Sequence, residues 1–300
     1  MRRYRLLTAT VLSLLLVLTT LVVFPVFAQP TFNGNAPADF GGLPNTVAVA
    51  DPGGVGDVGV PIPPAPPGTV SGWDVAVLYL NYDHATDTMY VGVDTFGICG
   101  DADGDGNPGG TSAWLAGLGG VDLADLSGTE SFCLLIDTNN DYVSGSGGPG
   151  IDVVVGVDSV NDITTFGAYN FVGSPFNPQA GFGAALPNTV TLYANPSAAA
   201  PDMEFSIANF STLPNASFTP GQAFSFQINL FMGSLQDNGV GEDYISSAGA
   251  TVSVNIVGQP PPEPGVVPEA STLILLGSGL AGLGVYARLR WRAGKRESRP

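Results

Sequence analysis

The sequence predicts an all-β protein, a β-sandwich or jelly roll with long Gly- and Asp-rich loops. Apolar and polar residues alternate over residues 224–232 and 251–256, which is the period of a strand with one buried face. Between such stretches lie clusters of Gly, Pro, Asp and Asn, the residue types that form turns. No stretch between residues 29 and 258 keeps a helical period for more than a few turns, so we expect packed sheets.

Six further short apolar runs are expected to be strands, at residues 75–82, 89–94, 131–136, 151–157, 190–193 and 203–207. They belong to one domain at residues 29–258, or to two related halves that divide near residues 165–185. The second arrangement is suggested by the stretch LPNTV, which follows Phe40 and occurs again after Phe182. A Pro-rich spacer, residues 259–268, follows the last strand and is expected to be extended.

Residues 1–28 have the three parts of a secretory signal peptide. Arg2, Arg3 and Arg5 precede an apolar run over residues 6–24, and the chain then reads PVFA up to Ala28. Small or apolar residues at the third and last positions before the cut predict cleavage after Ala28. The alternative is a retained membrane anchor, because the apolar run is longer than usual for a signal peptide.

The charge of the chain is strongly one-sided, with 26 Asp and Glu, 9 Lys and Arg and a net charge of −17. All positive side chains except that of His84 lie at the two ends, since no Lys or Arg occurs between Leu6 and Ala287. Such a domain repels nucleic acid and anionic headgroups and attracts divalent cations, cationic proteins or neutral ligands. Calcium is the expected counter-ion in an exported protein, although a saline habitat also favours acidic surfaces.

A candidate calcium loop occupies residues 101–107, which read DADGDGN. Asp101, Asp103 and Asp105 stand at positions 1, 3 and 5, Gly106 allows the sharp turn at position 6, and the carbonyl of Asn107 falls at position 7. The loop lacks the Glu at position 12 of an EF-hand, and it resembles the stand-alone loops of dockerin-like and thrombospondin-like repeats. Further carboxylates are then needed to close the site, with Asp122 and Asp125 as candidates; the alternative is a metal-free Asp/Gly turn.

A second, weaker copy of this spacing occurs at Asp137, Asn139 and Asp141. Tyr142 replaces the turn glycine, so a calcium site and an Asx-rich hairpin loop are both open. Asp152 could reach the same site. Calcium is therefore the expected cofactor of both loops.

The two cysteines, Cys99 and Cys133, stand just before the two acidic loops. In an exported chain with no other thiol, a disulfide between them is expected, and the alternative is a pair of buried thiols.

No enzymatic activity is expected, because a lone histidine and the absence of lysine between Leu6 and Ala287 make triads and histidine zinc sites hard to assemble. His84 is expected in a polar turn. A sugar-binding surface is the alternative to a structural role, and a secreted glycoside hydrolase ranks below it. Aromatic residues could provide that surface or belong to the core: Trp73, Trp114, Tyr79, Tyr82 and Tyr90. Residues 74–106 loosely resemble sandwich modules of the DOMON and carbohydrate-binding kind.

The C-terminal end has three parts: Val267, Pro268, Glu269, Ala270, Ser271 and Thr272, then an apolar Gly-rich run to Ala287, then an Arg-rich end. This order over residues 267–300 resembles the PEP-CTERM sorting signal. The apolar run is at the lower length limit for a transmembrane helix, and the arginines orient its end toward the cytoplasm. The resemblance implies processing by an exosortase and delivery to the cell surface or the exopolysaccharide matrix; a permanent membrane anchor is the alternative.

Together these features predict an exported, surface-sorted, calcium-binding protein with a structural or adhesive role in the surface matrix. The expected partners are an exosortase-type enzyme, the membrane before processing and extracellular polysaccharide, but not nucleic acid.

Overall fold

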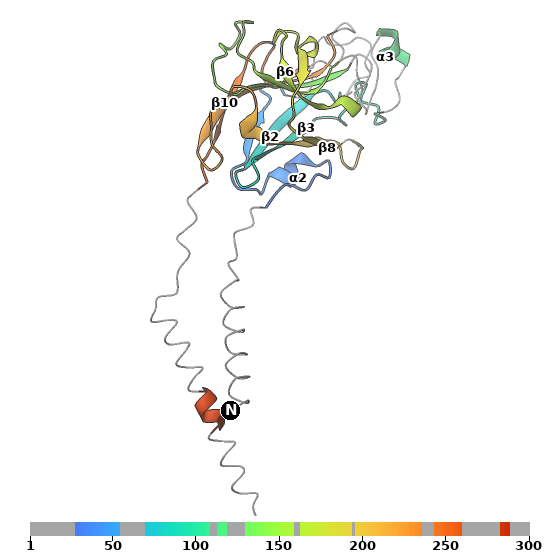
Figure 1. The fold of residues 1–300 in the computed structure, drawn as a ribbon. Coiled ribbons are helices and arrows are strands. Elements are labelled where there is room, and N and C mark those ends of the chain that lie inside the picture. Colours follow the sequence, from blue (N-terminus) through green and yellow to red (C-terminus); the bar gives the residue numbers. More distant parts are fainter. Residues whose placement is uncertain are drawn as a thin grey trace, which may run out of the picture. The chain divides into compact units, whose positions relative to one another are not determined.

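The computed structural model describes residues 28–54, 70–108, 113–118, 130–158, 163–193, 196–235, 243–259 and 283–288. The chain divides into two units, Met1–Gly258 and Gln259–Pro300. The first unit consists mainly of β-strands, which form two antiparallel sheets (Figure 1).

The first sheet, sheet A, has five strands in the order β1-β2-β3-β9-β8. All four of its pairings are antiparallel. Its strands are β1 (Val47–Ala50), β2 (Val75–Asp83), β3 (Thr88–Thr95), β8 (Val190–Tyr193) and β9 (Met203–Ala208). The two LPNTV stretches lead into β1 and β8, which are the two edges of this sheet. Strands from both sides of residues 165–185 therefore share one sheet.

The second sheet, sheet B, has seven strands, with the order β11-β10-β4-β5-β6-β7 and β12 paired to β10. Its strands are β4 (Ser131–Asp137), β5 (Val153–Val157), β6 (Gly167–Phe171), β7 (Phe182–Ala185), β10 (Phe224–Gly233), β11 (Asp243–Tyr244) and β12 (Val252–Ile256). The short helices are α2 (Ala36–Phe40), α3 (Ala113–Leu118), η1 (Ile163–Thr165), η2 (Pro178–Ala180) and η3 (Phe210–Thr212).

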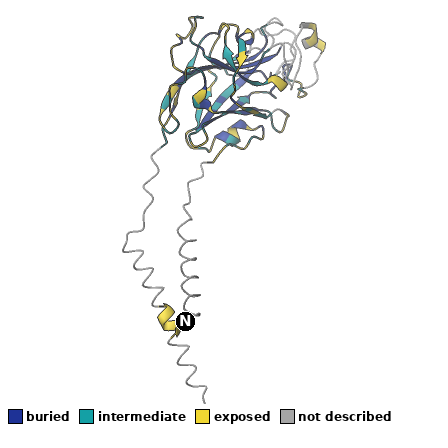
Figure 2. Cartoon of the chain, in the orientation of Figure 1, coloured by how far each residue is buried: buried dark blue, intermediate teal, exposed yellow. Residues whose placement is uncertain are grey.

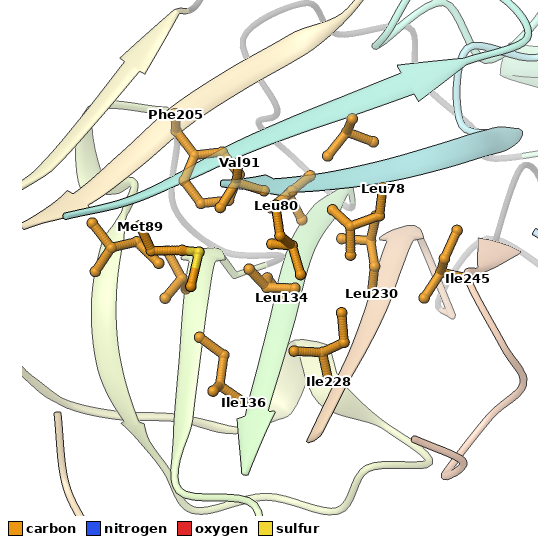
Figure 3. Packing of buried hydrophobic residues seen from close by; sticks show 14 of the residues in the cluster. Leu78, Leu80, Met89, Val91, Leu134, Ile136, Phe205, Ile228, Leu230 and Ile245 are labelled. Atoms are coloured by element: carbon orange, nitrogen blue, oxygen red, sulfur yellow. The ribbon is translucent and has the colours of Figure 1, made fainter. Parts of the chain in front are cut away.

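The two sheets pack face to face around one main core. Leu80, Val91 and Phe205 of sheet A contact the layer of sheet B that contains Leu134 and Ile228 (Figure 3). These side chains are almost completely buried, and each alternates along its strand with residues of the other face, as the period of a strand requires. The prediction of an all-β sandwich is confirmed, and the eight predicted strands correspond to β2, β3, β4, β5, β8, β9, β10 and β12.

Every residue of strand β4 is buried. Figure 2 shows buried residues, in dark blue, in the interior of the domain. Its inner face contributes to the main core, and its outer face belongs to a second apolar cluster. That second cluster contains Leu135 and, from the loop after β4, Tyr142. The Tyr142 hydroxyl donates to the Gly249 carbonyl over 2.6 Å, so the loop is fastened over the sheet. At this point sheet B therefore lies between the main core and the second cluster.

Helix α2 covers part of the outer face of sheet A. Asn35 caps the helix, since its side-chain oxygen accepts from the amide of Ala38 over 3.2 Å. Phe40 is fully buried and stacks on Tyr79 of β2, with ring centroids 5.9 Å apart. Gly92 of β3 lies beneath the helix, where a Cβ atom would come within 2.6 Å of the Phe40 ring. The missing side chain at Gly92 lets the helix approach the strand.

The predicted signal peptide, apart from Ala28, and the residues of the predicted sorting signal up to 282 lie outside the described residues. Residues 283–288 form a short helix with exposed side chains. Within the parts of the chain that the structure describes, no helix has both the length and the apolar character needed to span a membrane.

Candidate metal centre

The first acidic loop follows β3 and is held by backbone contacts on both sides. The Gly72 amide donates to the Asp101 carbonyl over 2.7 Å, and the Cys99 amide donates to the Pro201 carbonyl over 2.8 Å. A Cβ atom at Gly72 would lie only 1.6 Å from the Ile98 carbonyl oxygen, so only glycine permits this approach. The loop is thus fixed to the segments that lead into β2 and β9.

The structure brings the predicted ligands Asp101, Asp103 and Asp105 together. One carboxylate oxygen from each lies within 4.8 Å of the others, and no other group of three acidic, His or Cys side chains does so among the described residues. Asp101 and Asp103 are buried, with 1% and 3% of their surface exposed, whereas Asp105 is exposed. Hard oxygen ligands from alternate residues suit calcium, so this loop is a candidate calcium site.

The backbone of this loop turns around the Asp101 carboxylate. The amide of Asp105 donates to Asp101 Oδ1 over 3.1 Å, and the amide of Gly106 donates to Asp101 Oδ2 over 2.8 Å. Gly104 and Gly106 have φ angles of 66° and 90°, which glycine adopts without strain. Burial raises the pKa of Asp101 and the charge of Asp103 raises it further, while the amides, first that of Gly106, oppose this shift.

The second loop follows β4 and repeats this hydrogen-bond pattern. Asp137 accepts from the amide of Asp141 on Oδ1 over 3.3 Å and from that of Tyr142 on Oδ2 over 3.0 Å. Asn140 has a φ of 61°, close to the 66° of Gly104 at the corresponding position. Burial raises the pKa of Asp137, as it does for Asp101. In the sequence, the only sign that the two loops share a backbone geometry is the equal spacing of their acidic and amide residues.

The two loops differ in how their oxygens are used. In the second loop, Asn139 Nδ2 donates to Asp141 Oδ2 over 2.9 Å, which occupies an oxygen that a metal would need. Asp152 is turned elsewhere: its oxygens accept from Thr138 Oγ1 over 2.7 Å and from Asn215 Nδ2 over 2.6 Å. The first loop is therefore the better candidate metal site.

Other predicted ligands can be placed only in part. Asn107 is exposed, and its amide donates to Asp105 Oδ1 over 2.8 Å. Asp122 and Asp125, which could close the first site, lie outside the described residues.

The predicted disulfide is wrong in this structure, where Cys99 and Cys133 are both free and buried. Cys99 belongs to the main core between the sheets, whereas Cys133 belongs to the second cluster on the outer face of sheet B. The side chain of Cys133 points away from the main core because its neighbours in β4, Phe132 and Leu134, point into it. Burial raises the pKa of both thiols.

The predicted aromatic surface is largely interior. Trp73 is fully buried, and Tyr82 is 3% exposed and donates its hydroxyl to Asp87 over 2.6 Å. Tyr79 and Tyr90 are half-buried, and the Trp114 side chain lies outside what the structure describes. Trp73 and Tyr82 therefore belong to the core and not to a sugar-binding platform.

His84 links its turn to the end of sheet B. Its Nδ1 accepts from the Gly221 amide over 2.9 Å, and its Nε2 lies 2.9 Å from the Val257 carbonyl oxygen. Both ring nitrogens are engaged in holding the turn.

A polar pocket of about 370 Å³ lies beside the second loop, and the sequence offered no signal for it. Its polar lining is uncharged and comes from Thr138, Asn139, Asn140, Ser217, Thr219, Gln222 and Ser225. Phe218 and Phe224 also line it, and their rings stack with centroids 3.7 Å apart.

Comparison with known proteins identifies only the C-terminal segment. No curated protein and no solved structure matches the chain significantly, so the resemblance to DOMON and carbohydrate-binding modules is not confirmed. Residues 266–290 match the PEP-CTERM protein-sorting motif. This match covers the predicted sorting residues 267–272, and the motif implies export, processing by an exosortase and sorting to the cell surface. The chain is thus an exported, surface-sorted protein that carries a PEP-CTERM sorting motif.

Proposed function

We propose that this protein is a calcium-binding structural or adhesive component of the cell surface or its exopolysaccharide matrix. The observation that supports calcium binding most directly is the approach of Asp101, Asp103 and Asp105 oxygens to within 4.8 Å of one another. Two of these carboxylates are buried, and the chain has no Lys or Arg between Leu6 and Ala287 to neutralise them. A divalent cation would relieve both the repulsion and the cost of burial.

Calcium would also suit the proposed location. The sorting motif implies an exported protein, and extracellular calcium modules bind the ion with a Kd of roughly 10⁻⁴–10⁻³ M. An acidic domain with bound calcium can be linked through the ion to anionic polysaccharide. This supports a role in cohesion of the matrix more than a role in chemistry.

Calcium titration of the exported protein tests the proposal. At a tenfold excess of calcium over Kd, binding to the native state stabilises it by about 1.4 kcal/mol. This raises the melting temperature by about 3–6 °C for a domain of this size. Asp103→Ala combined with Asp105→Ala should abolish most of this rise, whereas Asn139→Ala with Asp141→Ala should leave it largely intact. Absence of binding heat at millimolar calcium in calorimetry would contradict the proposal.

A second candidate function is the binding of a neutral sugar, and the pocket beside the second loop favours it. Its volume of about 370 Å³ is within the usual range for ligand sites, and its amides and hydroxyls can donate to and accept from sugar hydroxyls. A glycan array probed with the calcium-loaded protein tests this function. Binding that Asn140→Ala and Gln222→Ala weaken would support it, and a blank array would refute it.

A further inference from the structure

Two carboxylates at the start of β9 hold the N-terminal segment on sheet A. Glu204 Oε2 accepts from the amides of Asn33 and Gly34, over 2.8 and 2.5 Å. Asp202 Oδ2 accepts from the amide of Ala36 over 2.8 Å. Glu204 is fully buried and Asp202 is 2% exposed. The first turn of α2 is therefore fastened to the sheet by buried acidic side chains.

The remaining oxygens of this cluster face other acids. Glu204 interacts through its side chain with Asp39 of α2. Glu204 Oε1 and Asp39 Oδ2 are both buried, and neither has a hydrogen-bond donor. Asp202 Oδ1 is also buried and has no hydrogen-bond donor. Burial and the negative charge of Asp94 in β3 raise the pKa of Asp202. The charge of Asp202 also acts on two other titratable groups, Tyr79 of β2 and Cys99.

Within residues 29–258, no Lys or Arg is present to compensate these acids. The sequence contains no Lys or Arg between Leu6 and Ala287, and His84 is bound to the Gly221 amide and the Val257 carbonyl. Either a metal ion or a proton must therefore separate Glu204 from Asp39.

The geometry favours the proton. A calcium ion needs six to eight converging oxygens, but among the described residues only Asp101, Asp103 and Asp105 bring three acidic ligands within 4.8 Å of one another. Two facing carboxyl oxygens are instead satisfied by one shared hydrogen, which turns one of them into a donor. In this arrangement Glu204 donates through Oε1 to Asp39 Oδ2 and continues to accept the amides of Asn33 and Gly34 on Oε2.

We propose that residues 33–40 form an acid-stabilised latch, held on sheet A by a proton shared between Glu204 and Asp39 and released when that proton is lost to solvent. Release exposes the part of the outer face of sheet A, including Tyr79, that Phe40 covers in the docked state. The latch is independent of the proposed calcium loop.

The direction of the pH dependence follows from burial. Burial, and then the hydrogen bond to and the charge of Asp39, raise the pKa of Glu204 to about 7, although the amides of Gly34 and Asn33 oppose the shift. Burial, aided by Asp94, raises the pKa of Asp202 to about 7 as well. A carboxyl with a raised pKa binds its proton more tightly in the docked state. Docking is therefore fully stabilised below the usual carboxyl range and weakens as the pH rises through 7.

Hydrogen exchange of the exported protein measures the latch directly, at the amides of Asn33, Gly34 and Ala36. After correction for intrinsic exchange, their protection should fall by roughly 10- to 100-fold between about pH 5 and about pH 8. Glu204→Gln places a neutral amide where the protonated carboxyl stands, and it should retain protection at about pH 8. If Glu204→Gln disturbs folding, Asp39→Asn serves the same purpose, because it also removes one of the two facing charges.

Asp51→Asn provides the control, since Asp51 caps a separate turn through the amide of Gly54 and should leave the pH profile unchanged. Equal protection at both pH values in the unmodified protein would overturn the proposal. The same conclusion would follow if Glu204→Gln and Asp39→Asn kept the original pH dependence. Protection at about pH 8 that depends on added calcium would assign the cluster to a metal ion and would also overturn the latch.

Discussion

Gly92→Ala tests whether the glycine of β3 sets the distance between helix α2 and sheet A. The new Cβ would lie 2.6 Å from Phe40 Cε2 and 2.9 Å from Ala36 Cβ, both closer than van der Waals contact. The helix must then shift, which costs about 1–3 kcal/mol as overpacking. Complete undocking would cost about 3 kcal/mol from the exposure of Phe40 alone, the value of burying one Phe side chain.

The expected result for Gly92→Ala is a lower melting temperature, by about 2–4 °C for each kcal/mol lost. Differential scanning calorimetry of the exported protein at about pH 5 measures it under conditions where the latch is closed. Gly42→Ala is a matched control close to the same helix, because nothing lies within 4 Å of its new Cβ. If Gly92→Ala had the same melting temperature as Gly42→Ala and the unmodified protein, α2 would not pack as described.

Two further predictions concern the thiols and the tail. Denatured, unreduced protein should show two titratable thiols and native protein almost none, because Cys99 and Cys133 are free and buried in separate clusters. A mass two hydrogens lower, with no titratable thiol, would show that the disulfide forms. An epitope tag placed after Pro300 should be absent from the mature surface protein, because the motif at residues 266–290 implies processing. A tag that stays with the surface protein would show that the tail is a permanent anchor.

Much of the sandwich could be predicted from local pattern. Strands β10 and β12 each keep one buried face, so alternation along 224–232 and 251–256 was enough to find them. Strands β1, β6, β7 and β11 were missed, because they are short and most of their residues are only half-buried or exposed. Such strands are defined by their hydrogen-bonded neighbour more than by their own sequence.

The error about the cysteines has a specific cause. Every residue of β4 is buried, so hydrophobicity does not reveal which residues face the main core. The disulfide was expected because the chain is exported and has no other thiol, but the structure places Cys99 in the main core and Cys133 in the second cluster on the outer face of sheet B. One residue of register decides whether the two sulfur atoms can approach each other.

The proximity of Asp101, Asp103 and Asp105 could be predicted from the sequence, because their spacing in one short loop is enough to bring them together. The contact between Asp39 and Glu204 joins residues far apart in the sequence, and only the pairing of β3 with β9 places them near each other. No local pattern carries that information.

The pairing of distant strands also constrains when this protein can fold. Strand β3 ends at Thr95, but it pairs with β9, which begins only at Met203. Strand β4 ends at Asp137, but it pairs with β10, which begins only at Phe224. Long-range pairs of this kind form slowly, because the loop between them must close first. Neither sheet can be completed until strands from late in the sequence are present. The strand order that defines the sandwich therefore also predicts slow folding of the domain.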